Sequence, residues 1–300
     1  MKLYIFLSIL ILVLCFSSIL MSINEKKIEY YSDNFNFQSK SKIFNNNMQI
    51  IVIGDLHGNK NALLRILQNE QLLDTNNNWI PNNNKMIIQV GDVVDRGPES
   101  LETLLLLKKI QQQAKKGQVI RLIGNHELLL LQNDLRFINK ETDTTEKIDI
   151  MKQIIKHDIL NNNMLYSFVL GNKLFIHAGL TINFLVKYNL NNKSLNQISY
   201  IMNNDMKNIV QNIESMGDAP LISNDGPLWV RNNYNNFPTN IIQIVGHSIK
   251  NNIHISPLNN LIYVDVGLTM NNRIGYLEIN NDQFLVHEGD YSNISVRKLL

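Results

Sequence analysis

The chain has 300 residues, a net charge of +2 and a hydrophobic fraction of 44%, so it is long enough for one large domain with a substantial core. So small a net charge argues against nucleic acid or an anionic membrane surface as the main partner. The single cysteine, Cys15, leaves no disulfide framework and no thiolate metal site, and it excludes catalysis by a thiol nucleophile.

An apolar stretch from Leu3 to Met21 follows the basic residue Lys2 and is broken only by three serines. Such a start is typical of a secretory signal peptide, and the stretch is also just long enough to span a bilayer as an uncleaved anchor. We therefore predict a signal peptide or signal anchor in residues 1–22 and a polar linker in residues 23–47. Both alternatives imply the secretory pathway, and the second implies membrane association through the N-terminus.

From residue 48 onward, short apolar runs alternate with helix-like segments. The runs Met48–Ile53, Met86–Val90 and Val119–Ile123 are rich in Ile and Val, which predicts buried parallel strands. Helices are expected between them, over residues 59–68 and from Pro98 to about Lys116. The order strand, helix, strand, helix, strand implies right-handed crossovers.

The second half of the chain predicts further helices and strands. A polar helix is expected over residues 142–160, followed by a strand pair over 165–170 and 173–176 that turns at Gly171. A mostly helical stretch then extends to about residue 216. Four more strands are expected, near residues 241–245, 261–264, 274–279 and 284–286. These elements predict an α/β catalytic domain over residues 48–300.

Polar side chains follow five of the predicted strands. Because the carboxyl ends of parallel strands meet at one edge of a sheet, we expect these side chains in one crevice. Carboxylate, amide and imidazole groups are the donors that a pair of divalent metals needs. Asp92 is the natural bridge between the two metals. The predicted partners are Asp55 and His57 for one metal, and Asn125, His177 and His247 for the other.

The residues beside these ligands predict in-line hydrolysis of a phosphomonoester by metal-activated water, without a covalent intermediate. Arg96 can hold two phosphate oxygens in a bidentate clamp. His126, paired with Asp95, can donate a proton to a leaving alkoxide or phenolate. The three histidines without a motif context, expected on the surface, are His157, His254 and His287.

Five segments together resemble the pattern of the calcineurin-like metallophosphoesterases, in their phosphoprotein phosphatase branch. They are Asp55–His57, Gly91–Gly97, Gly124–Glu127, His177–Gly179 and Gly246–His247. The resemblance implies a β-sandwich of two mixed sheets flanked by helices, with a dimetal centre at the strand ends. It also implies manganese, iron or zinc as the two divalent ions.

Two further segments are similar to the Shewanella-like phosphatases. Leu131–Phe137 resembles their Asn-Leu-x-Gly-Asp-Leu-Arg-Tyr stretch, although Asn133 replaces its Gly, and Gly226–Arg231 resembles their Pro-Leu-Trp-x-Arg element. The second likeness makes Arg231 a candidate phosphate-binding residue, with a surface salt bridge as the alternative. Eukaryotic serine/threonine members usually have His-Gly-Gly at the position of His177–Gly179, so Ala178 replaces the first Gly of their motif.

The leading hypothesis is a metal-dependent phosphoprotein phosphatase for phosphoserine, phosphothreonine or phosphotyrosine, with no readable docking motif for a regulatory subunit. A dinucleoside polyphosphate hydrolase is the first alternative, but that group generally lacks the pair found here as Asp95 and Arg96, and has Asp in place of Glu127. An inactive, membrane-associated scaffold is the second alternative. The presence of every expected ligand argues against it.

Overall fold

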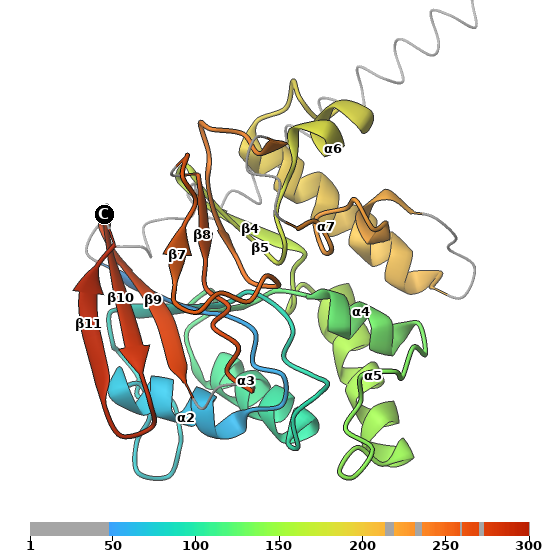
Figure 1. Cartoon of the computed structure of the whole chain (residues 1–300). Helices are drawn as coiled ribbons and strands as arrows, with labels where there is room; N and C mark the ends of the chain where they lie inside the picture. The colour runs from blue at the N-terminus through green and yellow to red at the C-terminus, as the bar shows by residue number, and fades with distance from the viewer. Residues whose placement is uncertain (1–47, 214–218, 232–235, 259, 270–272, 300) are drawn as a thin grey trace, which may run out of the picture.

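The computed structural model of the chain describes residues 48–213, 219–231, 236–258, 260–269 and 273–299. The predicted signal segment and linker, residues 1–47, lie outside the described residues. Figure 1 shows two sheets with helices on their outer sides, which confirms the predicted β-sandwich of two mixed sheets flanked by helices. Within the described ranges, no helix has both the length and the apolar character that crossing a membrane requires.

The first sheet has six strands in the order β11-β10-β9-β1-β2-β3. Its three parallel strands, all predicted, are β1 (Gln49–Ile53), β2 (Lys85–Gln89) and β3 (Val119–Arg121). An antiparallel meander extends it through β9 (Ile274–Asn280), β10 (Gln283–Gly289) and β11 (Ile294–Lys298). The last strand was not predicted, because four of its five residues are exposed and the segment carries no apolar run.

The second sheet has five strands in the order β4-β5-β6-β8-β7. Its parallel strands are β5 (Lys173–Ile176), β6 (Ile242–Val245) and β8 (Leu261–Tyr263). The antiparallel edge strands are β4 (Ser167–Leu170) and β7 (His254–Ile255). The predicted hairpin of β4 and β5 is confirmed, and Gly171 at its turn has φ of +61°, a conformation that glycine adopts without steric cost.

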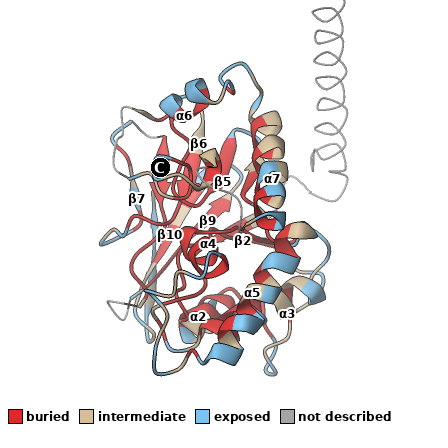
Figure 2. Cartoon of the chain, turned by 90° about the vertical axis from the view of Figure 1, so that its right-hand side faces the viewer, coloured by how far each residue is buried: buried red, intermediate tan, exposed pale blue. Residues whose placement is uncertain are grey.

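The helices lie outside the sandwich and turn their apolar sides toward it, as the burial colours of Figure 2 show. They are α2 (Lys60–Asn69), α3 (Ser100–Gln113), α4 (Asn125–Leu131), α5 (Thr145–Leu160), α6 (Ile182–Lys187) and α7 (Leu195–Gln211). Helix α3 ends three residues before the predicted Lys116, because Ala114 already has an extended backbone with ψ of 159°.

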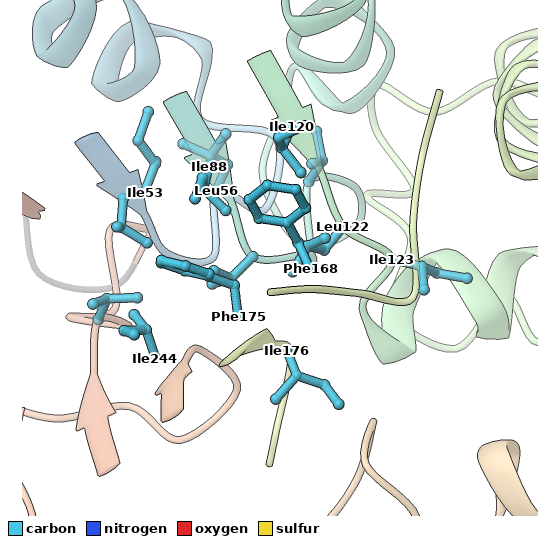
Figure 3. Close-up of a cluster of buried hydrophobic side chains, with 14 of the residues drawn as sticks. Ile53, Leu56, Ile88, Ile120, Leu122, Ile123, Phe168, Phe175, Ile176 and Ile244 are labelled. Carbon is cyan, nitrogen blue, oxygen red and sulfur yellow. The ribbon is translucent and has the colours of Figure 1, made fainter. Parts of the chain in front are cut away.

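The core lies between the two sheets, where aliphatic side chains of the first sheet meet aromatic ones of the second. In Figure 3, Ile53 and Ile88 on one side face Phe175 and Ile244 on the other, and all four are buried. Each such side chain contributes roughly 1.5–3 kcal/mol by leaving water. This packing holds the carboxyl ends of β1, β2, β3, β5 and β6 at a common edge, where the predicted site residues lie.

The surface assignment of His287 was wrong. It lies on β10, its side chain is 3.8 Å from the carboxylate of Glu70 at the end of α2, and the residue is only 6% exposed. One ring nitrogen hydrogen bonds to Glu278 Oε2 at 2.8 Å, and the ring stacks on Tyr276 with the centroids 4.5 Å apart. The sequence carries no motif around His287, so only the pairing of β9 with β10 reveals these partners.

Candidate metal centre

The six predicted metal ligands all lie at strand ends and are all buried, none more than 5% exposed. Asp55 and His57 follow β1, and Asp92 follows β2. Asn125 is the first residue of α4, just beyond β3. His177 and His247 follow the neighbouring parallel strands β5 and β6 of the second sheet. The structure therefore brings together residues that are up to 192 positions apart in the sequence.

Asp92 lies at the middle of this cluster. Its Oδ2 is 3.4 Å from His177 Nε2 and 3.7 Å from His57 Nε2. It belongs to both groups of potential ligands in the described residues, one with His57 and His126 and the other with His177 and His247. Within each group the donor atoms lie within 4.8 Å of one another. This is the position that a carboxylate bridging two metals must take.

Main-chain carbonyls orient the three ligand histidines. A carbonyl oxygen only accepts hydrogen bonds, so the ring nitrogen beside it carries the proton, and the other nitrogen is left to face the centre. Outer contacts of this kind accompany most metal-binding histidines. The pairs are His57 Nδ1 with Val94 O (3.0 Å), His177 Nδ1 with Val90 O (2.9 Å), and His247 Nε2 with Trp229 O (3.2 Å).

Two of these imidazoles are held neutral at physiological pH. Burial lowers the pKa of His57 to about 4. Burial, followed by the positive charge of His177 when it is protonated, lowers the pKa of His247 to about 3. Neutral imidazole is the form that binds metal ions.

The carboxylates of the cluster favour a bound positive charge. Burial, together with repulsion from Asp265 and Asp92, raises the pKa of Asp55 well above its usual range. Crowded, buried carboxylates beside neutral imidazoles have the oxygen and nitrogen donors that Mn, Fe and Zn ions accept. The residues present therefore fit a pair of divalent metals, with Asp55 and His57 on one side of Asp92, and Asn125, His177 and His247 on the other.

Asp265 is a buried acidic residue of the site to which sequence reasoning gave no role. It is 2% exposed, hydrogen bonds to Asp55, and accepts the Gly267 N–H at 2.9 Å. Its position two residues beyond β8 places it at the same edge as the ligands. The signal in the sequence was therefore the same as for the ligands, an Asp after a buried strand.

Glycines make room for the two central carboxylates. A Cβ added to Gly124 would lie 2.2 Å from Asp92 Oδ1, and one added to Gly246 would lie 2.1 Å from Asp55 Oδ1. Neither separation is sterically possible. The glycine before each ligand loop is thus required by the close approach of a carboxylate from a neighbouring loop.

Several site residues have a left-handed backbone, which is uncommon for residues other than glycine. The φ angles are +44° at His57, +56° at Asp92, +69° at Asp95, +65° at Arg96 and +61° at His247. Such strain costs of the order of 1–3 kcal/mol per residue and persists only where surrounding contacts enforce it.

Glu127 is a major source of those contacts, and sequence reasoning assigned it no role. Its buried carboxylate accepts main-chain N–H groups from Asp92 (2.9 Å), Val93 (2.7 Å), Val94 (3.2 Å) and Gly124 (2.7 Å). One side chain thus joins the loop after β2 to the start of α4. Its place at the third position of that helix is the sequence signal, since a Glu there can cap the helix start.

The predicted acid–base pair is in contact. His126 Nδ1 lies 2.7 Å from Asp95 Oδ2, and both side chains are buried. Because a carboxylate accepts, Nδ1 carries a proton, and Nε2 accepts a hydrogen bond from Arg96 Nη2 at 3.2 Å. Asp92 Oδ1 also accepts the main-chain N–H of His126 at 2.9 Å. His126, Asp95 and Arg96 therefore stand together beside the metal-ligand cluster.

Arg231 lies beside His247. Its Nη1 donates to the main-chain oxygen of His247 at 2.9 Å, and the residue is exposed. The surrounding segment reaches the site because Pro227 O accepts the N–H of Ala178 at 2.9 Å. Its predicted contact with phosphate stays a prediction.

A cavity of about 420 Å³ opens beside Arg96. Its walls come from Gly58, Asn59, Asn61, the segment Arg96–Glu99, and Thr269. These residues are polar or small, and none is aromatic. The cavity therefore lies next to the candidate phosphate-binding residue.

The fold and this cluster define the class of protein. The chain belongs to the calcineurin-like phosphoesterases, because the model of that family matches residues 48–266. The family is built around a dimetal centre, and the His and Asp groups described above fit two divalent ions. The predicted family and cofactor class are thereby confirmed.

Within this family, the chain is similar to Shewanella-like phosphatases. It is 31% identical to Shewanella-like protein phosphatase 1 of Plasmodium berghei over 69% of this chain and 57% of that protein. It is 34% identical to Shewanella-like protein phosphatase 2 of Arabidopsis thaliana over 31% of this chain and 24% of that protein. The chain thus spans about a quarter to somewhat over half of these curated relatives.

A solved structure shows the same fold. It is the cold-active protein-tyrosine phosphatase of a psychrophilic Shewanella species, with a TM-score of 0.68 at 19% sequence identity. The likeness covers 84% of this chain and 80% of that one.

Proposed function

We propose that this chain is a metal-dependent phosphoprotein phosphatase. The observation that carries the proposal is the His126–Asp95 pair, which stands next to Arg96 at the edge of a buried cluster of metal-type ligands. A phosphomonoester needs three things for hydrolysis: a nucleophile, a group that neutralises its charge, and an acid for the leaving oxygen. When bound, the two cations supply Lewis acidity and lower the pKa of water.

The side chains supply the other two functions. Arg96 leaves Nε2 of His126 and donates instead to the phosphate oxygens, for which its planar guanidinium is well suited. His126 Nε2, released from Arg96, takes up a proton from solvent water and donates it to the ester oxygen as the bond to phosphorus breaks. Asp95 accepts from Nδ1 throughout, so it keeps the ring oriented and stabilises the imidazolium form.

The alternatives are weaker. The two curated relatives described above are protein phosphatases by name, and the chain has the Asp95–Arg96 pair and Glu127 that dinucleoside polyphosphate hydrolases generally lack. A scaffold without activity would not need an acid–base pair held at 2.7 Å.

The test uses the full-length chain, purified and loaded with manganese, which we propose as one of the metals that support activity. Phosphotyrosine and phosphoserine peptides are compared with diadenosine tetraphosphate, and Asp92→Asn and a chelator-treated sample serve as controls. Rapid phosphopeptide hydrolysis that both controls lose supports the proposal. Hydrolysis of the dinucleotide alone would contradict the proposal and support a dinucleoside polyphosphate hydrolase. No turnover of any substrate by a folded, metal-containing sample would support the inactive scaffold.

We also propose that the chain enters the secretory pathway through residues 1–22, either cleaved or as a membrane anchor. The support is the apolar stretch Leu3–Met21 behind Lys2. Tagging the C-terminus and fractionating cells tests this. A tagged protein found in the cytosol with its N-terminus intact would contradict it.

A further inference from the structure

Strand β11 forms an open edge of the first sheet, as Figure 1 shows. It stands at the end of the strand order, and four of its five residues are exposed. One of them is the apolar residue Val296, which is 56% exposed. An unpaired edge strand presents a row of main-chain donors and acceptors to which another strand can bind. Strand β11 is therefore a candidate surface for association with another chain.

The other edges of the two sheets are covered or very short. At β3, Ile123 N–H donates to Leu165 O at 2.8 Å, and Leu165 N–H donates to Arg121 O at 2.9 Å. At β4, the side chain of Asn203 on α7 donates to Ser167 O at 3.0 Å. Strand β7 has only two residues. Within the described part of the chain, β11 is thus the one edge of full strand length that lacks such cover.

The pairing of β11 with β10 fixes which of its main-chain groups are free. At one end of the pairing Leu299 N–H donates to Phe284 O at 2.8 Å, and at the other end Asp290 N–H donates to Asn293 O at 3.0 Å. The main-chain groups of successive residues in an antiparallel strand point alternately to its two sides. Every second residue counted from Asn293 therefore points toward β10. The residues whose N–H and C=O groups point away from β10 are Ile294, Val296 and Lys298.

A second copy of β11 fits this edge in an antiparallel register. With a two-fold axis at Val296, each Val296 lies opposite the other, and Ile294 of one copy lies opposite Lys298 of the second copy. Each outward N–H then meets an outward C=O, which is the arrangement of a hydrogen-bonded antiparallel pair. An axis at Ser295 leaves Lys298 without a partner inside the strand, and an axis at Arg297 does the same to Ile294. The axis at Val296 therefore gives the most hydrogen bonds.

The charges of the strand permit this register. Lysine on an edge strand ordinarily prevents two identical edges from pairing, because the like charges repel. Here Lys298 lies opposite Ile294 of the second copy, so the two lysines do not face each other. Arg297 lies opposite Ser295, and its charge is already paired with Glu288 of its own chain at 3.1 Å. No like charges are therefore directly opposed.

We propose that two copies of this chain associate through β11 and form a two-fold symmetric dimer with one continuous sheet. The two exposed Val296 side chains pack against each other at the axis, as β-branched residues do across neighbouring strands. The pairing is closed, because each copy uses its open edge once. The contact is short, so we expect a weak dimer with a Kd of about 10–100 µM. This inference does not depend on the proposed function.

Disulfide trapping tests the register. The full chain is used with Cys15→Ser, which removes its only native thiol. Opposed residues in a hydrogen-bonded antiparallel pair have Cα atoms about 5.5 Å apart, a separation that a disulfide can span. Val296→Cys should therefore give a covalent dimer on mild oxidation. Val186→Cys is the matched control, since this valine on α6 is similarly exposed, and it should not be trapped.

Sedimentation of the full chain at rising concentration measures the equilibrium. Val296→Lys opposes two like charges at the axis and should weaken the dimer by at least about 10-fold. Val296→Pro should weaken it as well, because it removes an N–H that β10 does not use. Val296→Thr keeps that N–H and the β-branched shape, and should retain the dimer. Melting curves confirm that each variant is folded.

Three results would overturn the inference. Equal trapping of Val296→Cys and Val186→Cys would show that the thiols meet by random collision. Sedimentation as a monomer up to about 1 mM, well above the expected Kd, would show that the edges do not pair. A dimer of unchanged affinity in the folded Val296→Lys variant would show that the copies associate through another surface.

Discussion

At the scale of single residues, each ring nitrogen of His126 has its own hydrogen-bond partner. Nδ1 is committed to Asp95 at 2.7 Å, and Nε2 is shared with Arg96 at 3.2 Å. Because Arg96 cannot act as an acceptor, Nε2 can carry a proton only when the Arg96 guanidinium moves away, for example to bind an anion. In the proposed mechanism, the binding of phosphate by Arg96 and the protonation of His126 are therefore coupled.

This arrangement predicts the effect of His126→Asn. The variant should lose about 10²- to 10⁴-fold in kcat on phosphopeptides, the usual contribution of a general acid. The loss should be much smaller on para-nitrophenyl phosphate, whose leaving group needs no proton. Metal content, measured by mass spectrometry, should be unchanged. The control is His157→Asn on exposed α5, and an equal loss on both substrates would show that His126 has a role other than proton donation.

At the scale of elements, the site is held by main-chain contacts between loops. Glu127 on α4 binds the loop after β2 through three N–H groups and its own helix start through a fourth. Those contacts fix Asp92, whose backbone is left-handed. The predicted ligand Asp92 is therefore positioned by a residue outside the predicted ligand set.

We expect Glu127→Gln to disturb both stability and metal binding. A Gln side chain has one acceptor oxygen, so at least two buried N–H groups lose their partner, at about 1–3 kcal/mol each. The free energy of unfolding should fall by at least about 2 kcal/mol, and metal content should fall with it. Glu102→Gln is the matched control, since its partner Lys147 is at the surface and such pairs contribute less than about 1 kcal/mol. Equal denaturation midpoints for the two variants would contradict the assignment.

A second buried contact joins β3 to α5 and α3. Arg121, which is fully buried, pairs with Asp158 at 2.6 Å, and Lys108 binds the other carboxylate oxygen. Burial disfavours the ionised Asp158, but the charges and hydrogen bonds of Arg121 and Lys108 outweigh it and hold the pKa of Asp158 below its usual value. Ionised Asp158 therefore stabilises the fold.

Asp158→Asn leaves the Arg121 charge buried without its partner and should lower stability by about 3–5 kcal/mol. Because the pKa of Asp158 is lower in the folded state, its contribution is present above its unfolded pKa of about 4 and is lost as pH falls through the folded value. Urea midpoints should thus differ by a constant amount between pH 5 and 8 and converge below pH 4. A difference that grows on acidification would contradict this assignment.

At the scale of the whole molecule, the centre lies where the ends of two sheets meet. Asp55, His57, Asp92 and Asn125 come from the side of the first sheet, and His177 and His247 from the second. Ions that bind between these residues bind only to the folded chain, because the unfolded chain does not bring the residues near one another.

Metal binding should therefore stabilise the whole domain. At a free metal concentration 1,000-fold above Kd, the gain is about 4 kcal/mol, so a chelator should lower the melting temperature reversibly. Differential scanning calorimetry with and without metal measures this, and Asp92→Asn should show little response. A melting temperature independent of metal in the wild type would argue against binding between the sheets.

The amino-acid sequence by itself predicted the parallel strands, their polar ends and the candidate ligand set. Each was readable because it is local: an apolar run such as Met86–Val90 followed at once by Gly91 and Asp92. Histidine and aspartate at five such ends also carried the likeness to the family. The signals were strong because both the buried strand and the metal impose fixed residue types at fixed spacing.

Only the tertiary structure decided which residues support the site. Asp265 meets Asp55 from 210 positions away, and His287 is buried against Glu278 and Tyr276, partners that the apolar runs of β9 and β10 do not identify. The left-handed backbone of Asp95 and the contact between Phe137 and His126 also depend on loops that pack against one another. Such contacts form when the two sheets pack against each other. A local sequence pattern does not predict which distant loop will lie beside it.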